Sequence, residues 1–319
     1  MPSATGPIAD LSYRTYDGPL DPPTHRWKVI AKATALRVAR NKWFWYVAFF
    51  SGWYYVVMGI LLFGLDMVKQ AGGTQGANAF NELLALDWPG QFLHGFSFGQ
   101  LGFMLIALMA GAGAIANDNR SNALLVYLSK PCTKKDYLIG KWVGVFVPLL
   151  AAMAIPAVAF YIFGALNYRD FGFITQDAWI PLRMAAIISL SAAFYASLVL
   201  GVSSMFNQGR LAGATYAGIY VISNFVTRVM WIILVEADDA PAALRSLAEK
   251  LYYFSIDGLC IGIAKVFLDL DSAPMFMIPE SEFTIDRPIP LLALGVMAAL
   301  AALALRVAWK RIRAVEIVN

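Results

Sequence analysis

The chain has 319 residues, of which 59% are hydrophobic and 14% are charged, and its mean hydropathy is +0.61. Soluble globular chains contain about 45–50% apolar and about 25% charged residues, so this composition excludes a soluble enzyme and indicates an integral membrane protein. Two cysteines, Cys132 and Cys260, and two histidines, His25 and His94, are too few for a disulfide framework or a typical zinc site. We therefore expect no metal or redox cofactor.

Residues 1–25 are polar and contain prolines and glycines, without the apolar segment that a cleavable signal peptide needs. We expect them to form a cytoplasmic N-terminal arm. The next segment, residues 26–42, places apolar side chains along one side of a helix and Lys and Arg on the others. This pattern predicts an amphipathic elbow helix that lies on the inner membrane surface before the first span.

Six apolar stretches are long enough to cross a bilayer as helices, which takes about 20 residues each. They are residues 43–65, 93–116, 138–166, 181–206, 211–235 and 290–308. Lys and Arg are concentrated before the first stretch, between the second and third, and after the sixth. Because cytoplasmic loops are enriched in basic residues, we expect both termini in the cytoplasm. The predicted fold is all-α and polytopic, with six transmembrane helices in a single domain over residues 26–319.

A long outer segment, residues 236–288, is predicted between the fifth and sixth spans. It contains an apolar run, Leu251–Leu268, that approaches the length of a seventh span. An odd number of spans would place the basic C-terminus outside. In addition, Asp257 and Lys265 would each raise the free energy of membrane insertion by about 2.5–3.5 kcal/mol at the centre of a span. We predict that the run forms a re-entrant or an interfacial helix, and the sequence leaves both alternatives open.

The segment between the second and third spans, residues 117–137, contains the most informative pattern. Ser121–Ser129 can form a short helix that Pro131 ends, and Thr133 can open a second turn that leads into the third span. A short helix parallel to the membrane would transmit the movement of a soluble partner to two spans at once. The alternative is a positively charged loop that only fixes the topology.

The order of features in this segment resembles the coupling segment of type-2 ATP-binding-cassette (ABC) permeases. In that family an acidic residue precedes a short apolar helix, which is followed by Leu-Ser-x-Pro and then by Gly-Lys. The matching positions here are Asp118, Asn122-Ala123-Leu124, Leu128-Ser129-Lys130-Pro131 and Gly140-Lys141. Asp replaces the usual Glu, and Asn-Ala replaces the usual Gly-Thr. The plan of six spans, an elbow helix and a helical outer segment resembles the same family.

The resemblance implies a permease domain at residues 26–319 that serves as the membrane subunit of an ATP-driven exporter in a bacterial cytoplasmic (inner) membrane. It also implies a second permease chain, identical or related, and separate ATPase subunits that bind ATP and Mg²⁺. This chain itself is expected to bind no cofactor, metal or nucleic acid. The positions that the resemblance implicates in coupling to the ATPase are Asp118, Asn119, Arg120, Asn122, Leu124, Leu125, Leu128, Ser129 and Pro131.

The chain is not expected to be catalytic. A phosphate-binding P-loop needs a glycine, four further residues, and then Gly-Lys followed by Ser or Thr. The pair Gly140-Lys141 has Lys135 in place of that first glycine and is followed by Trp142. ATP is therefore expected to bind to another subunit.

Polar residues recur every four positions along the fifth predicted span, so they share one side of the helix. Intramembrane ionisable groups usually face a bundle interior or a wet cavity. The alternative for Arg228 is a side chain that extends to the outer interface and supports packing. The resemblance places the transport path near the second and fifth spans at the dimer interface, and the candidate path residues are Tyr216, Tyr220, Asn224, Arg228, Gln100 and Ser97.

Two other functions are compatible with parts of this composition and arrangement of spans. A non-transporting anchor or scaffold subunit of a membrane complex would have the same composition and spans. An ion-gradient transporter usually carries acidic residues at the membrane midplane, and none of the six predicted spans contains a carboxylate. The sequence therefore favours the permease over the ion-gradient transporter.

Overall fold

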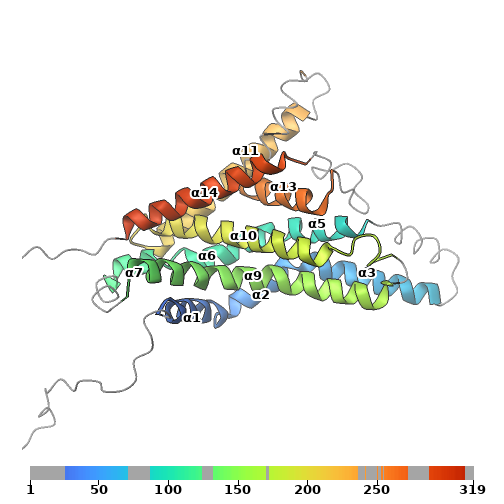
Figure 1. The fold of residues 1–319 in the computed structure, drawn as a ribbon, viewed down its shortest axis with the longest axis horizontal. Coiled ribbons are helices and arrows are strands. Elements are labelled where there is room, and N and C mark those ends of the chain that lie inside the picture. The colour runs from blue at the N-terminus through green and yellow to red at the C-terminus, as the bar shows by residue number, and fades with distance from the viewer. Residues whose placement is uncertain are drawn as a thin grey trace, which may run out of the picture.

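The computed structural model of the chain describes residues 26–70, 87–123, 132–169, 172–235, 255–271 and 287–312, together with residues 241, 250 and 253. All regular elements in these residues are α-helices, which form one elongated bundle (Figure 1). The helices are α1 (Arg26–Ala39), α2 (Lys42–Ser51), α3 (Trp53–Gln70), α5 (Trp88–Phe98), α6 (Gln100–Gly111), α7 (Ala116–Arg120), α9 (Lys134–Asn167), α10 (Ile180–Ser203), α11 (Gly209–Val235), α13 (Ile256–Leu268) and α14 (Pro290–Arg311).

Helix α1 packs along the first half of α9. Its buried residues, Ile30, Ala31, Thr34 and Val38, recur at helical spacing and form one apolar face. Two glycines of α9 allow the close approach: a Cβ added to Gly140 would lie 2.7 Å from the Cβ of Ile30, and one added to Gly144 would lie 2.5 Å from the Cβ of Thr34. The apolar face of this predicted amphipathic helix is thus covered by α9.

The first predicted span, residues 43–65, is broken in the structure. Helix α2 ends at Ser51 and α3 begins at Trp53, and the two helices are bent by 53° relative to each other. Gly52 lies at the break and contacts α9, where an added Cβ would come within 2.5 Å of the Cβ of Pro156. The absence of a side chain at Gly52 therefore allows the bend to rest against the proline ring.

Four helical units in the described residues are long and apolar enough to cross a membrane: Gln100–Arg120, α9, α10 and α14. The bent pair of α2 and α3 becomes a fifth if it crosses as one unit. Helix α11 covers the fifth predicted span, residues 211–235, and is not among these units. Its 27 residues extend about 40 Å along the helix axis, which exceeds the thickness of a hydrocarbon core.

Helix α9 begins as the sequence predicts and is the longest helix of the described residues. Thr133 Oγ1 accepts a hydrogen bond from the Asp136 backbone N–H at 3.2 Å, and Asp136 Oδ2 accepts one from the Thr133 backbone N–H at 3.1 Å. This reciprocal arrangement is a capping box, which stabilises the first turn. The prediction that Thr133 opens the turn leading into the third span is confirmed, and α9, 34 residues long, continues through Pro148 and Pro156.

Helix α13 lies inside the bundle, where it contacts α5, α10, α11 and α14 (Figure 1). Ser255 caps its first turn by accepting a hydrogen bond from the Gly258 N–H at 2.9 Å, and Asp269, at φ +58°, ends it. All residues from Ile256 to Lys265 are buried. The part of the run Leu251–Leu268 that the structure describes as α13 is therefore packed among other helices.

Candidate functional site

Several helix ends meet at one end of the bundle, at the left in Figure 1. Helix α7 lies there beside the starts of α9 and α11 and the end of α10. In the sequence, α7 directly precedes the predicted coupling helix and α9 follows it. The central part of that helix lies outside the described residues, together with the predicted coupling positions Leu124, Leu125, Leu128, Ser129 and Pro131.

Three polar side chains join α7 to α9 in what we call the α7 cluster: Asp118, Tyr137 and Lys141. The Lys141 ammonium lies 2.7 Å from Oδ2 of Asp118, and the Tyr137 hydroxyl donates a hydrogen bond to the same oxygen at 2.8 Å. Tyr137 and Lys141 are four residues apart and therefore lie on one face of α9. The ammonium also lies 5.5 Å from the centre of the Tyr137 ring, within the range of a cation–π contact.

The α7 cluster is buried, so the stability of the folded protein depends on the ion pair between Asp118 and Lys141. Asp118 is 8% exposed and Lys141 is 2% exposed. Charges taken out of water lose their hydration, so each needs the other as a partner. Asp118 and Lys141 are 23 positions apart in the sequence, and both belong to the pattern that resembles the type-2 ABC permeases. The structure brings these two positions into direct contact.

The end of α10 is hydrogen-bonded to the backbone just before and at the start of α7. The Ser203 hydroxyl accepts hydrogen bonds from the backbone N–H groups of Ile115 and Ala116, each at 3.1 Å, and donates one to the carbonyl oxygen of Ala112 at 2.8 Å. These contacts satisfy backbone groups at the break between α6 and α7, where the regular helical hydrogen bonds are interrupted.

Two asparagines of α7 bind the connection from α10 to α11. Asn117 Oδ1 accepts a hydrogen bond from the Gly209 backbone N–H at 3.1 Å, and Asn119 Nδ2 donates one to the carbonyl oxygen of Phe206 at 3.2 Å. Asn119 is one of the predicted coupling residues. Its described contact is made to the connection between the fourth and fifth predicted spans, so α7 is attached to α9, α10 and α11 together.

The two remaining described coupling positions, Arg120 and Asn122, are exposed. Asn122 has φ +51°, a left-handed conformation that ends a helix and that asparagine adopts more readily than most residues. The sequence predicts a helix over Ser121–Ser129, and the structure adds a separate short helix, α7, immediately before it. Ser121 donates its hydroxyl back to the carbonyl oxygen of Asn117 at 2.9 Å.

Replacing Ser203 with alanine is expected to destabilise the protein by about 1–3 kcal/mol, because the buried N–H groups of Ile115 and Ala116 lose their acceptor. The measurement is the free energy of unfolding in mixed detergent micelles. Ser204→Ala is the matched control, since the buried Ser204 hydroxyl only donates to the carbonyl oxygen of Gly201, within the same turn. Equal losses for the two variants would contradict the role given to Ser203.

Two of the candidate path residues belong to a second polar group, the Asp257 cluster, which comprises Gln100, Tyr195, Tyr220 and Asp257. The Tyr195 hydroxyl lies 2.8 Å from Oε1 of Gln100 and 3.2 Å from Oδ1 of Asp257. The Tyr220 hydroxyl donates to Oδ2 of Asp257 at 2.7 Å. The cluster thus connects α6, α10 and α11 through one carboxyl group of α13.

The other four candidate path residues are Tyr216, Asn224, Arg228 and Ser97. Tyr216 and Asn224 are buried on the same side of α11 as Tyr220, as their spacing predicts. Arg228 is exposed in the single chain. The Ser97 hydroxyl donates to the carbonyl oxygen of Leu93 in its own helix at 2.8 Å. Two of the six predicted residues, Tyr220 and Gln100, are thus joined through Tyr195 and Asp257, and Asn224 Nδ2 donates to the carbonyl oxygen of Tyr220 in its own helix at 2.9 Å.

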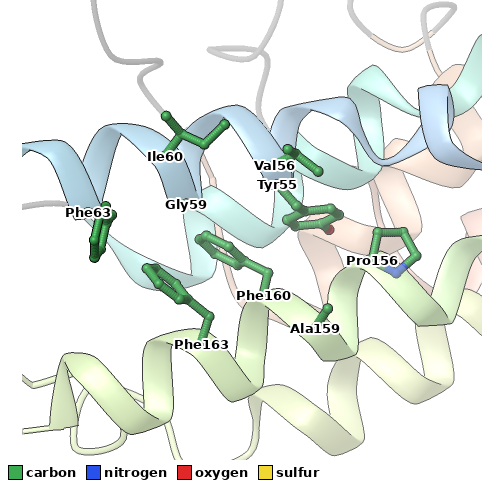
Figure 2. Close-up of a pocket in the computed structure, with 9 residues that line it drawn as sticks. All are labelled: Tyr55, Val56, Gly59, Ile60, Phe63, Pro156, Ala159, Phe160 and Phe163. Carbon is green, nitrogen blue, oxygen red and sulfur yellow. The ribbon is translucent and has the colours of Figure 1, made fainter.

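Apolar grooves also lie between the helices, and the one in Figure 2 has a volume of about 380 Å³. It lies between α3 and α9. Nine residues line it: Tyr55, Val56, Gly59, Ile60, Phe63, Pro156, Ala159, Phe160 and Phe163. The hydrogen of the Tyr55 hydroxyl is directed away from a ligand, because it is donated to the carbonyl oxygen of Phe92 at 3.0 Å. This groove therefore offers contacts for hydrocarbon and no chemistry for a polar ligand.

The sequence singles out some of these residues only weakly. Tyr195 and Ser203 are polar residues in a stretch of apolar and small residues, a pattern that also arises from simple helix packing, and Asn117 lies in a polar run beside the predicted coupling positions. Asp257 lies in a segment predicted outside the six spans. The described residues contain no group of three or more His, Cys, Asp or Glu side chains placed to hold a metal ion.

A bundle of long apolar helices with a buried ion pair at one end defines an integral membrane protein with a structured junction between its second and third predicted spans. The family model of the ABC-2 family transporter protein matches residues 27–306. The chain belongs to this family, whose members are transmembrane permease components of ABC transporters and are not themselves catalytic. A comparison with curated proteins finds no match.

Proposed function

We propose that this chain is the permease subunit of an ATP-driven ABC exporter in a bacterial cytoplasmic membrane. In this proposal it crosses the membrane six times, with both termini in the cytoplasm, and pairs with a second permease chain that is identical or related. Separate ATPase subunits bind ATP and Mg²⁺ and contact the segment 117–137. Membership of the ABC-2 family supports the permease role.

The attachment of α7 is the observation that carries the coupling role. The α7 cluster fixes α7 to the start of α9, while Ser203, Asn117 and Asn119 fix it to the junction of α10 and α11. Force applied to the segment after α7 would therefore reach three long helices at once. A loop that only fixes topology through its charge needs no such contacts.

The arrangement of basic residues supports the proposed topology. The Lys134 ammonium, at the start of α9, lies 4.6 Å from the centre of the Trp309 ring, near the end of α14. The basic ends of these two helices, together with Arg120 of α7, are therefore at the same end of the bundle. Basic residues gathered at one end favour a cytoplasmic position for that end.

The coupling role can be tested by reversing the charge of Arg120, which is exposed at the end of α7. We expect Arg120→Glu to lower the amount of ATPase subunit that co-purifies with the detergent-solubilised chain by about tenfold, equivalent to about 1.4 kcal/mol of binding free energy. ATP hydrolysis by the purified complex should fall in parallel. The measurements are quantitative mass spectrometry of the pulled-down proteins and release of inorganic phosphate.

Arg311→Glu is the matched control, because Arg311 is also exposed and basic but lies at the end of α14, outside the segment 117–137. Equal losses in both variants would indicate a general effect of charge and not a specific contact. If the wild-type chain retains no nucleotide-hydrolysing partner, the coupling proposal fails and the non-transporting anchor subunit becomes the better description.

A further inference from the structure

A pocket of about 210 Å³ lies where the end of α1 meets the break between α6 and α7. Drug-sized ligands occupy pockets of about 300–1,000 Å³, whereas one water molecule takes up about 30 Å³ of the liquid. The pocket therefore has the size for a small polar group. Nine of the described residues line it: Thr34, Arg37, Val38, Asn41, Met109, Ala110, Gly113, Ala114 and Asn117.

Three side chains bring nitrogen donors to this pocket, in contrast to the apolar groove of Figure 2. Arg37 of α1 is exposed, and its guanidinium group carries five N–H donors and no acceptor. Asn41 adds an amide group from the connection between α1 and α2, and Asn117 adds one from α7. Polar side chains therefore reach the pocket from both the α1 side and the α7 side.

Hydrogen bonds within the chain fix the orientation of the two amide groups. Asn117 Oδ1 accepts from the Gly209 backbone N–H at 3.1 Å. Its Nδ2 lies next to Gly113 of the pocket wall, where an added Cβ would come within 2.5 Å of it. Asn41 Oδ1 accepts from the Trp43 backbone N–H at 3.1 Å, so its Nδ2 is the end left for a ligand. Both amides thus offer hydrogen-bond donors to the pocket.

The wall of the pocket carries a net positive charge, because it contains one guanidinium group and none of the nine lining residues is acidic. The acid beside Asn117 in the sequence, Asp118, is directed to α9, where it pairs with Lys141. Helix α2 begins at Lys42, directly after Asn41, and the N-terminus of a helix favours a nearby negative charge. The charge and the donors together favour an anion in this pocket.

A phosphate group matches these donors best among the common anions. Its oxygens accept several hydrogen bonds at once, and a guanidinium group binds phosphate through two parallel N–H···O bonds. A carboxylate has two oxygens in one plane, whereas the donors here come from three side chains on different segments. Helix α1 is also the segment predicted to lie on the inner membrane surface, where the phosphate groups of lipids are found.

We propose that this pocket is a phosphate-binding site, for the phosphate of a phospholipid headgroup or for free phosphate, and that the bound group joins α1 to α7 through Arg37 and Asn117. Asn41 supplies a further donor from the connection between α1 and α2. The inference concerns the chain alone and stands whether or not the segment 117–137 couples to an ATPase.

The test is the thermal melting temperature of the purified full-length chain in detergent, titrated separately with inorganic phosphate and with phosphatidic acid added to the micelles. A ligand that binds the folded chain raises this temperature. We expect at least one probe to raise it above its reference, which is chloride at equal ionic strength for phosphate and diacylglycerol for phosphatidic acid. A rise with phosphatidic acid alone assigns the site to a lipid headgroup, and a rise with inorganic phosphate shows that the phosphate group is sufficient.

Arg37→Gln should weaken the apparent affinity for the effective probe by about tenfold or more, because it removes charge-assisted hydrogen bonds. Arg40→Gln is the matched control, since Arg40 is another exposed arginine, directly after α1, that does not line the pocket. It should leave the affinity unchanged. No rise with either probe in the wild type, or equal losses in the two variants, would overturn the proposal.

Asn117→Asp tests the α7 side of the pocket. It keeps the oxygen that accepts from the Gly209 N–H and replaces the Nδ2 donor with a carboxylate oxygen, which should abolish the rise in melting temperature. A rise of wild-type size in this variant would show that phosphate binds elsewhere, and the proposal would be rejected. These measurements need no nucleotide or partner, so their failure is distinct from a failure of the coupling test with Arg120→Glu.

Discussion

Replacing Lys141 with methionine is expected to destabilise the protein by about 3–5 kcal/mol, because the Asp118 carboxylate would remain buried without its cation. Methionine keeps most of the length and volume of the lysine side chain, so the lost charge accounts for most of the effect. The measurement is the free energy of unfolding from titration with a denaturing detergent, followed by circular dichroism. This is the largest effect that we predict for a single substitution.

Two further variants separate the ion pair from a general effect of substitution. Lys135→Met changes an exposed lysine of the same helix and should alter the unfolding free energy by less than about 0.5 kcal/mol. The double variant Asp118→Leu with Lys141→Met removes both charges and should recover most of the loss. A loss below about 1 kcal/mol for Lys141→Met, a typical value for an exposed ion pair, would contradict the burial of the α7 cluster.

Replacing Gly144 with leucine is expected to separate α1 from α9. The first added carbon would lie 2.5 Å from the Cβ of Thr34 and 2.9 Å from the backbone oxygen of Ala31, and backbone cannot move aside as a flexible side chain can. We expect a loss of about 3 kcal/mol, at the upper end of the range for overpacked sites. Trypsin should also cleave α1 faster at Lys28 and Lys32 once the helix is displaced.

Gly295→Leu is the matched control, because it makes the same change within a helix at a position where an added Cβ meets nothing within 4 Å. Leucine favours a helix over glycine by about 0.8 kcal/mol, so this variant should be neutral or slightly stabilised. Unchanged tryptic cleavage of α1 in Gly144→Leu would show that α1 does not depend on close contact with α9.

Much of the fold could be predicted because apolar length and helical periodicity are local properties of the sequence. The stretches 138–166, 181–206 and 290–308 correspond to α9, α10 and α14, and Thr133 begins α9 as predicted. The break at Gly52 could not be predicted, since it depends on contact with Pro156, which is more than 100 positions away. The division of the second predicted span at Gly99 likewise depends on a neighbour, because an added Cβ there would lie 2.7 Å from the backbone oxygen of Ser51.

The α7 cluster could be predicted in part. The order of residues in the sequence indicates Asp118 and the Gly140-Lys141 pair, but the direct contact of Asp118 with Lys141 depends on the position of α7 beside the start of α9. Tyr137 has no special feature in the sequence, and its role follows only from lying one turn before Lys141. The roles of Asn117 and Ser203 also depend on contacts between distant segments, which helical periodicity does not encode.

The position of Asp257 shows that the predicted spans alone do not identify all of the residues inside the bundle. The six predicted spans contain no carboxylate, and this was the argument against a role for protons or sodium ions. The structure introduces a carboxyl group into the bundle from a segment between the fifth and sixth spans, where it meets Tyr195 and Tyr220. An acidic residue can therefore lie among the spans without belonging to any of them.

The burial of α13 also constrains the order in which the chain can assemble. Helices α5, α6, α10 and α11 precede α13 in the sequence, and α14 follows it. During synthesis these four helices are made before α13, so Tyr195 and Tyr220 exist before Asp257, to which their hydroxyl groups bind. The bundle reaches its final hydrogen bonding only when α13 inserts, and α14 then packs against it. Completion of the interior is thus a late event in the synthesis of the chain.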